Sequence, residues 1–152
     1  MYKGYDASSG PPTSHDIFAA IGYLGHVLRV RAGGRGGKQF VLMTLANHGG
    51  HMCQKELFGC SSTSSAALSE VLSKLEAEHL IERTTSERDR RQLDVSLTAE
   101  GTVKADQIAR DRKRFEDETL SCLTDDERLA FMVLLDKVAR HRNDLEEREV
   151  RG

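Results

Sequence analysis

Two imidazoles and a thiol lie close together in the segment His48-Gly49-Gly50-His51-Met52-Cys53. These side chains are ligands that Zn²⁺ accepts, and a zinc site needs about three of them within tetrahedral reach. No other Cys/His pair stands nearby, because His79 and His141 lie far along the chain. The sequence therefore favours a polar loop here and predicts no bound metal or cofactor. A metal-responsive sensor that uses His48, His51 and Cys53 stays open as an alternative.

The thiols of Cys53, Cys60 and Cys122 offer a second kind of chemistry, reversible oxidation. A thiol switch needs a low-pKa cysteine near a positive partner, preferably with a second cysteine to resolve it. The spacing of Cys53 and Cys60 puts them on roughly one face of a short helix, which is more typical of two buried small side chains. Cys122 is expected in the core. The odd number fits no disulfide framework and agrees with a reducing, cytoplasmic compartment. A thiol-responsive sensor remains a further alternative.

The sequence gives little support to catalysis or to nucleotide binding. Carboxylates are plentiful, but they alternate with Lys and Arg, and neither a nucleophile elbow nor an H-E-x-x-H pattern occurs. The glycine-rich run Gly33–Gly37 is not a P-loop, because Ala32 stands where the first glycine is needed and Gln39 follows Lys38. We expect a plain loop there and a protein that is not an enzyme.

A cluster of arginines points to nucleic acid instead. Residues 83–91 contain four arginines against Glu87 and Asp89, a local net charge of +2, although the whole chain has a net charge of −2. DNA affinity comes largely from neutralised phosphates, so a chain of this charge needs such a local patch. Arginines at the tip of a hairpin can also enter a narrow, A·T-rich minor groove. A solvated, charged turn is the simpler alternative.

Helices and a hairpin would have to position these arginines. Helical periodicity predicts a short helix at 54–60 and a second at 65–78, where Leu68, Val71, Leu72 and Leu75 form one apolar stripe. Two strand-like runs follow, and the second alternates apolar and polar residues over 93–97, as a hairpin with one buried face requires. Helix, turn, helix and hairpin in this order predict a winged helix-turn-helix, in which the second helix enters the major groove.

The outward face of that second helix carries small and polar side chains. Ser64 is its expected N-cap, and the helix N-terminus could take a phosphate. Glu70 would repel phosphates, although it could accept from a cytosine amino group. Lys74 is the only cation on this helix. We therefore expect modest direct base recognition, with more weight on the hairpin and on DNA shape. A winged-helix protein-interaction module without DNA binding is the alternative that Glu70 suggests.

The flanking segments predict a mainly α protein with an aliphatic core. Residues 1–14, rich in Gly, Ser and Pro, suggest a flexible arm. A heptad-like stripe follows over 16–31, and a short helix is expected at 38–47. Thr98 should cap a long charged helix to about residue 121, and Thr124 with Glu127 forms a capping box before a last helix that frays near its end. No run is long enough to span a membrane.

The region from about residue 17 to about residue 147 resembles the MarR family of bacterial transcriptional regulators. The family's wing motif D-R-R-x-x-x-V-x-L-T-x-x-G is present as Asp89, Arg90, Arg91, Val95, Leu97, Thr98 and Gly101. Further matching pieces lie upstream: Gln39, Phe40, Leu42 and Leu45, then QKEL at 54–57, then LSKLEAEHLIER at 72–83.

The resemblance implies a homodimeric repressor of transcription that binds a palindromic operator as double-stranded DNA. It implies a helical dimerisation region at 15–36 and 99–150 around a DNA-binding domain at 37–98, and a small aromatic effector that releases the DNA. One of Arg90 and Arg91 would enter the minor groove while Asp89 holds the wing by pairing with an arginine. Of the two, we take Arg91 as the groove contact. The residues expected at the DNA are Ser64, Ser65, Ala66, Ser69, Glu70, Ser73, Arg88, Arg90 and Arg91.

Overall fold

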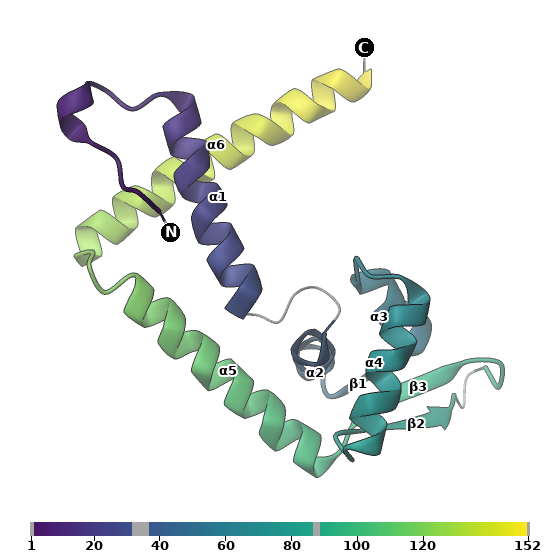
Figure 1. The fold of residues 1–152 in the computed structure, drawn as a ribbon. Coiled ribbons are helices and arrows are strands. Elements are labelled where there is room, and N and C mark those ends of the chain that lie inside the picture. The colour runs from purple at the N-terminus through teal and green to yellow at the C-terminus, as the bar shows by residue number, and fades with distance from the viewer. Residues whose placement is uncertain (1, 32–36, 87–88, 152) are drawn as a thin grey trace. The chain divides into compact units, whose positions relative to one another are not determined.

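The structure, a computed structural model, describes residues 2–31, 37–86 and 89–151 (Figure 1). The chain divides into two compact units, residues 1–112 and 113–152. Its elements follow the sequence in this order: η1 (Ala7–Ser9), α1 (Ser14–Arg31), α2 (Lys38–Asn47), β1 (His51–Cys53), α3 (Gln54–Cys60), α4 (Ser65–Ala77), β2 (Ile81–Thr85), β3 (Leu93–Leu97), α5 (Ala99–Thr119) and α6 (Asp125–Arg151). The predicted fold class, mainly α with a small hairpin wing, is confirmed.

An aliphatic core holds α2, α3 and α4 against the sheet. The predicted stripe of α4 is buried at Leu68, Leu72 and Leu75, whereas Val71 is half-buried at its edge. The rest of the core comes from neighbouring elements: Val41, Leu42, Leu45, Met52, Leu57, Ile81, Val95 and Ala105. Because the side chains of this cluster are apolar, their packing sets which face of α4 points outward.

The sheet has three antiparallel strands in the order β1–β3–β2, one more than the predicted hairpin. The expectation of a loop over 48–53 is therefore wrong for its last three residues, where Met52 is buried opposite Val95. Pairing with β3 satisfies backbone groups that a buried loop would leave unpaired. The predicted alternation of β3 is confirmed at Val95, but Leu93 is 38% exposed because it lies toward the hairpin tip.

Thr98 and Gly101 fix the start of α5 on the turn that follows α4. The Thr98 hydroxyl accepts from the Gly101 N–H at 2.9 Å and donates to the His79 carbonyl at 2.6 Å. A Cβ added at Gly101 would lie 1.8 Å from the Leu80 carbonyl oxygen, so only glycine allows this approach. The predicted cap at Thr98 is confirmed, and it ties α5 to the α4–β2 turn.

Helices α1 and α6 bury no residue within the described chain. The arm before α1 contains η1, and its Tyr2 ring stacks on Tyr23 with 5.5 Å between centroids. The predicted fraying of the last helix is wrong: α6 continues to Arg151, supported by ion pairs such as Arg140–Asp136 at 2.8 Å and Arg142–Glu146 at 3.1 Å. The glycine-rich break at 33–37 lies almost wholly outside the described residues. Among the described helices, none is long and apolar enough to cross a membrane.

Candidate nucleic-acid interface

The outward face of α4 carries the small side chains that the sequence predicts for a recognition helix. Ser64 is the N-cap, and its hydroxyl accepts from the Ala67 N–H at 3.3 Å. Ser69 is half-buried, and its carbonyl accepts from the Ser73 hydroxyl at 3.0 Å. The remaining predicted contact residues of this helix are all exposed: Ser65, Ala66, Glu70 and Ser73. Short side chains on this face leave room for a close approach to a partner surface.

Glu70 has a partner on its own helix. Its carboxylate accepts from the Lys74 ammonium at 2.7 Å, an i,i+4 pair on the exposed face. This hydrogen bond, together with the positive charge of Lys74, holds the pKa of Glu70 below its ordinary value. Lys74 therefore offsets the negative charge that Glu70 places at this position. The four-residue spacing is the signal that could have shown the pair beforehand.

Arg83 belongs to the base of the hairpin and is also paired. Its Nε donates to the Glu76 carboxylate at 3.0 Å, and Nη2 contacts the same oxygen, so α4 and β2 are joined by a two-pronged contact. The hydrogen bonds from Arg83 lower the pKa of Glu76. Counting Arg83 among the free charges of the wing overestimates the positive charge available at its tip.

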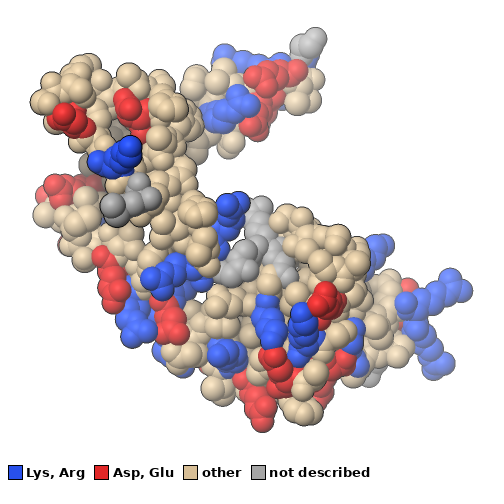
Figure 2. All heavy atoms as spheres, viewed as in Figure 1, with Lys and Arg blue, Asp and Glu red and all other residues tan. Residues whose placement is uncertain are grey.

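Arg90 and Arg91 lie exposed at the tip of the β2–β3 hairpin. Across the described residues, neither guanidinium has a hydrogen-bond or ion-pair partner. In Figure 2, Lys and Arg side chains project at the end of this hairpin, beyond the body of α3, α4 and the sheet. Arg88, the third predicted wing contact, lies outside the described residues. Two unpaired cations on a protruding hairpin are available to an anionic partner.

Asp89 organises the turn that carries these arginines, through hydrogen bonds. Its Oδ1 accepts from the Arg91 backbone N–H at 3.0 Å, and its Oδ2 accepts from the Gln92 side-chain amide at 2.9 Å. In the part of the chain that the structure describes, no arginine side chain pairs with Asp89, in contrast to the pairing that the resemblance implied. Gln92, the residue just before β3, is thus part of the wing.

The candidate metal and thiol residues do not come together. Nδ1 of His48 lies 2.7 Å from the Thr44 carbonyl oxygen, and within the described residues no group of three His, Cys, Asp or Glu side chains could hold a metal ion. Cys53 is half-buried, while Cys60 and Cys122 are exposed. The predicted burial of Cys60 and Cys122 is therefore wrong. Cys60 ends α3 and Cys122 follows the end of α5, and both residues are exposed.

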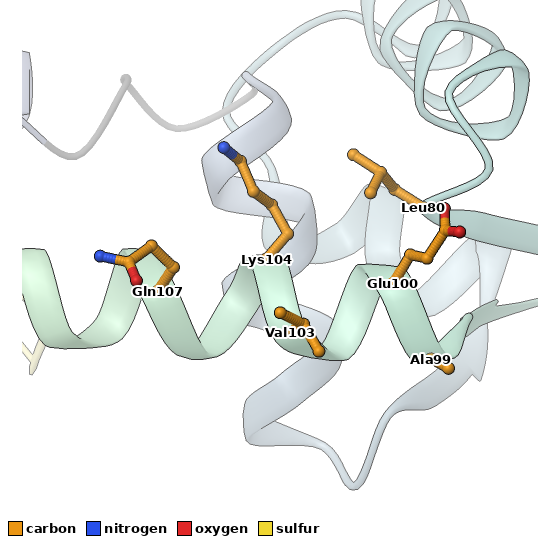
Figure 3. Close-up of a pocket in the computed structure, with 6 residues that line it drawn as sticks. All are labelled: Leu80, Ala99, Glu100, Val103, Lys104 and Gln107. Atoms are coloured by element: carbon orange, nitrogen blue, oxygen red, sulfur yellow. The ribbon is translucent and has the colours of Figure 1, made fainter.

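A shallow hollow of about 510 Å³ lies between the turn after α4 and the first turns of α5 (Figure 3). Leu80 projects into it from the turn, and its other lining residues all come from α5: Ala99, Glu100, Val103, Lys104 and Gln107. Its floor is apolar, and its charged lining residues are one cation, Lys104, and one anion, Glu100.

Comparison with known proteins identifies the relatives of this chain. Residues 38–93 match the model of the MarR family. The chain is 34% identical to the HTH-type transcriptional repressor MdtR of Bacillus subtilis (strain 168) over 101 residues, which cover 66% of this chain and 64% of MdtR. This alignment spans less than two thirds of the length of that relative.

Solved structures agree with this match. The YusO protein from Bacillus subtilis superposes with a TM-score of 0.64 at 28% identity, over 83% of this chain and 94% of YusO. The organohalide-sensing regulator RdhR-CbdbA1625, solved with 2,4-dichlorophenol bound, has the same fold, with a TM-score of 0.63 at 17% identity over 93% and 88% of the two chains. MdtR and RdhR-CbdbA1625 are both named as transcriptional regulators, in agreement with the predicted absence of catalysis. The wing motif, the helix order and these matches together identify a MarR-family domain in this chain, and residues 38–93 are the part that the family model covers.

Proposed function

We propose that this chain is a homodimeric regulator of transcription that binds a specific palindromic DNA site and represses transcription. The observation that carries the proposal is the pair of exposed, unpartnered guanidiniums of Arg90 and Arg91 on a protruding hairpin, in the same compact unit as α4. The relative MdtR is named a transcriptional repressor, which supports the direction of control.

In this proposal α4 lies in the major groove. Ser65, Ala66, Ser69 and Ser73 approach base edges, with hydroxyls as adaptable partners and the alanine methyl against thymine methyls. The N-terminus of α4 at Ser64 faces a phosphate. The paired Glu70 is close enough to the groove to accept from a cytosine amino group. No long cation on α4 is free to reach guanine, so direct base recognition is modest.

The hairpin tip supplies most of the affinity in this proposal. Arg91 enters a narrow minor groove next to the major-groove contact, with Arg90 and Arg88 at the flanking phosphates. Because neither Arg90 nor Arg91 must break an internal ion pair to bind, each releases counterions from DNA at little cost. Asp89 keeps the turn in the shape that presents them.

A second copy of the chain completes the DNA-binding unit. The α1 side chains Ile17, Ile21, Leu24 and Leu28 are 37–48% exposed, and Leu129, Met132 and Val133 of α6 are 57–66% exposed. Apolar surface of this extent on helices marks an association surface. We assign residues 15–36 and 99–150 to the dimer interface and 37–98 to the DNA-binding domain. The two recognition helices would then lie about 34 Å apart, one turn of DNA.

We further propose that the protein is cytoplasmic and that a small aromatic effector controls the release of DNA. The relative RdhR-CbdbA1625 was solved with 2,4-dichlorophenol bound. In this chain the hollow at Leu80 and Val103 would hold an aromatic ring, and Lys104 would pair with a phenolate or carboxylate. The effector must favour the geometry that cannot bind DNA, with a coupling of about 1–3 kcal/mol.

Fluorescence anisotropy across a salt series tests the proposal. The purified chain is titrated against a duplex from its own upstream region and against a scrambled duplex of equal length. We expect binding to the natural duplex well above the scramble, with a steep negative dependence of log K on log [salt]. Weak and equal binding to both duplexes would instead support a winged-helix protein-interaction module. Adding a phenolic compound to the bound complex then tests effector release.

A further inference from the structure

The side chain of Gln92 lies between the hairpin tip and strand β1 and contacts both. Its amide nitrogen donates to Oδ2 of Asp89 at 2.9 Å, and its amide oxygen lies 2.8 Å from the thiol sulfur of Cys53. An ionised carboxylate can only accept, so the Gln92 nitrogen must face Asp89, and its oxygen must then accept from the thiol. These two contacts therefore have one consistent direction, from Cys53 to Gln92 to Asp89.

The backbone of Gln92 is engaged at the same point. Its N–H donates to the Asp89 carbonyl at 2.8 Å, and its carbonyl accepts from Ser86 at 2.9 Å. Asp89 in turn accepts from the Arg91 N–H at 3.0 Å. Gln92 is half-buried and Ser86 is 6% exposed, so these hydrogen bonds are partly shielded from water. One residue thus closes the tip and connects it to the sheet.

Cys53 anchors the other end of this chain of hydrogen bonds. It is the last residue of β1, paired with Asp94 of β3, and it is the N-cap of α3, where its N–H donates to the Glu56 carboxylate at 3.3 Å. Its position is therefore set by the sheet and by the first helix of the helix-turn-helix. The described residues of the hairpin tip, Asp89 to Arg91, have no comparable core packing of their own, because all three are exposed.

We propose that the Cys53–Gln92–Asp89 relay positions Arg90 and Arg91 for DNA, with Gln92 and Cys53 as positioning residues of the wing. This inference rests on the proposed DNA-binding function. The relay holds the backbone at Arg91, so both guanidiniums leave the tip in a fixed direction relative to α3 and the sheet. Without the relay, the arginines keep their charge but lose their fixed orientation. Affinity for the specific site then falls more than affinity for non-specific DNA.

Variants matched in size test the relay. Gln92→Met preserves length and removes both hydrogen bonds without adding charge. Cys53→Ala removes the thiol donor, Cys53→Ser restores a donor, and Cys60→Ala is the control at the exposed cysteine that ends α3. We expect Gln92→Met and Cys53→Ala to weaken binding to the natural duplex about 5- to 10-fold. This is a smaller loss than removal of a DNA-contacting arginine would cause. Binding to scrambled DNA should change less than about 2-fold, and Cys53→Ser should recover most of the affinity.

A double-mutant cycle separates positioning from general stability. In the background of Arg90→Ala with Arg91→Ala, the variant Gln92→Met should have no further effect on affinity, since the relay acts only through those arginines. An equal reduction of about 5- to 10-fold in both backgrounds overturns the proposal. Amide hydrogen exchange at Arg91, measured without DNA, should accelerate in Gln92→Met and in Cys53→Ala but not in Cys60→Ala, and unchanged exchange overturns it as well.

The wild-type titration separates the two proposals. If the wild-type chain binds no duplex specifically, the proposed function fails, and the role of the relay in DNA binding fails with it. If the wild-type chain binds and depends on Arg90 and Arg91 while Gln92→Met binds equally well, the relay alone is wrong.

Discussion

The cations of α4 and of the hairpin base differ from the described cations of the hairpin tip in one respect, the presence of partners. Lys74 is paired with Glu70, and Arg83 is paired with Glu76, whereas Arg90 and Arg91 at the tip are unpaired among the described residues. The paired cations stabilise the helix or join α4 to β2. Net charge therefore says less about DNA binding than the availability of individual cations does.

The largest effect is expected at the tip. Arg90→Ala with Arg91→Ala should weaken binding to the natural duplex about 100-fold or more, since each arginine that reaches DNA is worth roughly 1–3 kcal/mol. The slope of log K against log [salt] should become shallower by roughly 0.9 for each phosphate that is no longer neutralised. Anisotropy measures both quantities, and sedimentation checks that the oligomeric state is unchanged. Wild-type affinity in this variant would place the DNA-binding surface elsewhere.

A smaller effect is expected at the start of α4. Ser64→Ala removes the hydroxyl that accepts from the Ala67 N–H and should lower the free energy of unfolding by about 1 kcal/mol. Ser62→Ala, in the exposed turn just before, is the matched control and should change stability by less than about 0.5 kcal/mol. Urea titration monitored by circular dichroism gives both values. Equal stability of the two variants would show that the cap contributes little.

The pair on α4 offers a test in the opposite direction. Glu70→Gln frees Lys74 from its partner and should strengthen binding to both natural and scrambled duplexes about threefold, with a salt dependence steeper by up to roughly 1. Adding Lys74→Gln to this variant should cancel the gain. Because Lys74 lowers the pKa of Glu70, the carboxylate stays ionised through neutral pH and the gain should be the same at about pH 6 and about pH 8. Weaker binding to the natural site alone would show that Glu70 accepts from a base.

Sequence patterns predicted most of the secondary structure in the proposed DNA-binding domain, residues 37–98. Leu68, Leu72 and Leu75 follow the helical period, so both the existence of α4 and its outward face followed from spacing. The caps at Ser64 and Thr98 were equally local. Strand β1 was missed because three residues are too few for a period, and its pairing with β3 is long-range.

The charges of the site were harder to predict, for a related reason. The Glu70–Lys74 pair is four residues apart and could be found by inspection, but Glu76 and Arg83 meet only across the turn between α4 and β2. The hydrogen bond of Cys53 with Gln92 joins positions 39 residues apart. Which side chains meet across such long sequence separations depends on the register of the sheet, and the spacing of residues along the sequence does not determine that register.

The smallest effect is expected at the hairpin base, where the paired Arg83 can be compared directly with the unpaired arginines of the tip. Arg83 lowers the pKa of Glu76, so the pair stabilises the fold above the ordinary carboxyl value of 4.5, and this stability disappears as pH falls through the lowered value. Glu76→Gln should cost at most about 1 kcal/mol at about pH 7, because the Glu76 side chain is 39% exposed, and the difference from wild type should shrink by about pH 3. Denaturant titrations at both pH values measure this change. DNA affinity should change less than about twofold, since Arg83 belongs to the base and not to the tip; a gain comparable to that of Glu70→Gln would mean that pairing with Glu76 withholds Arg83 from DNA.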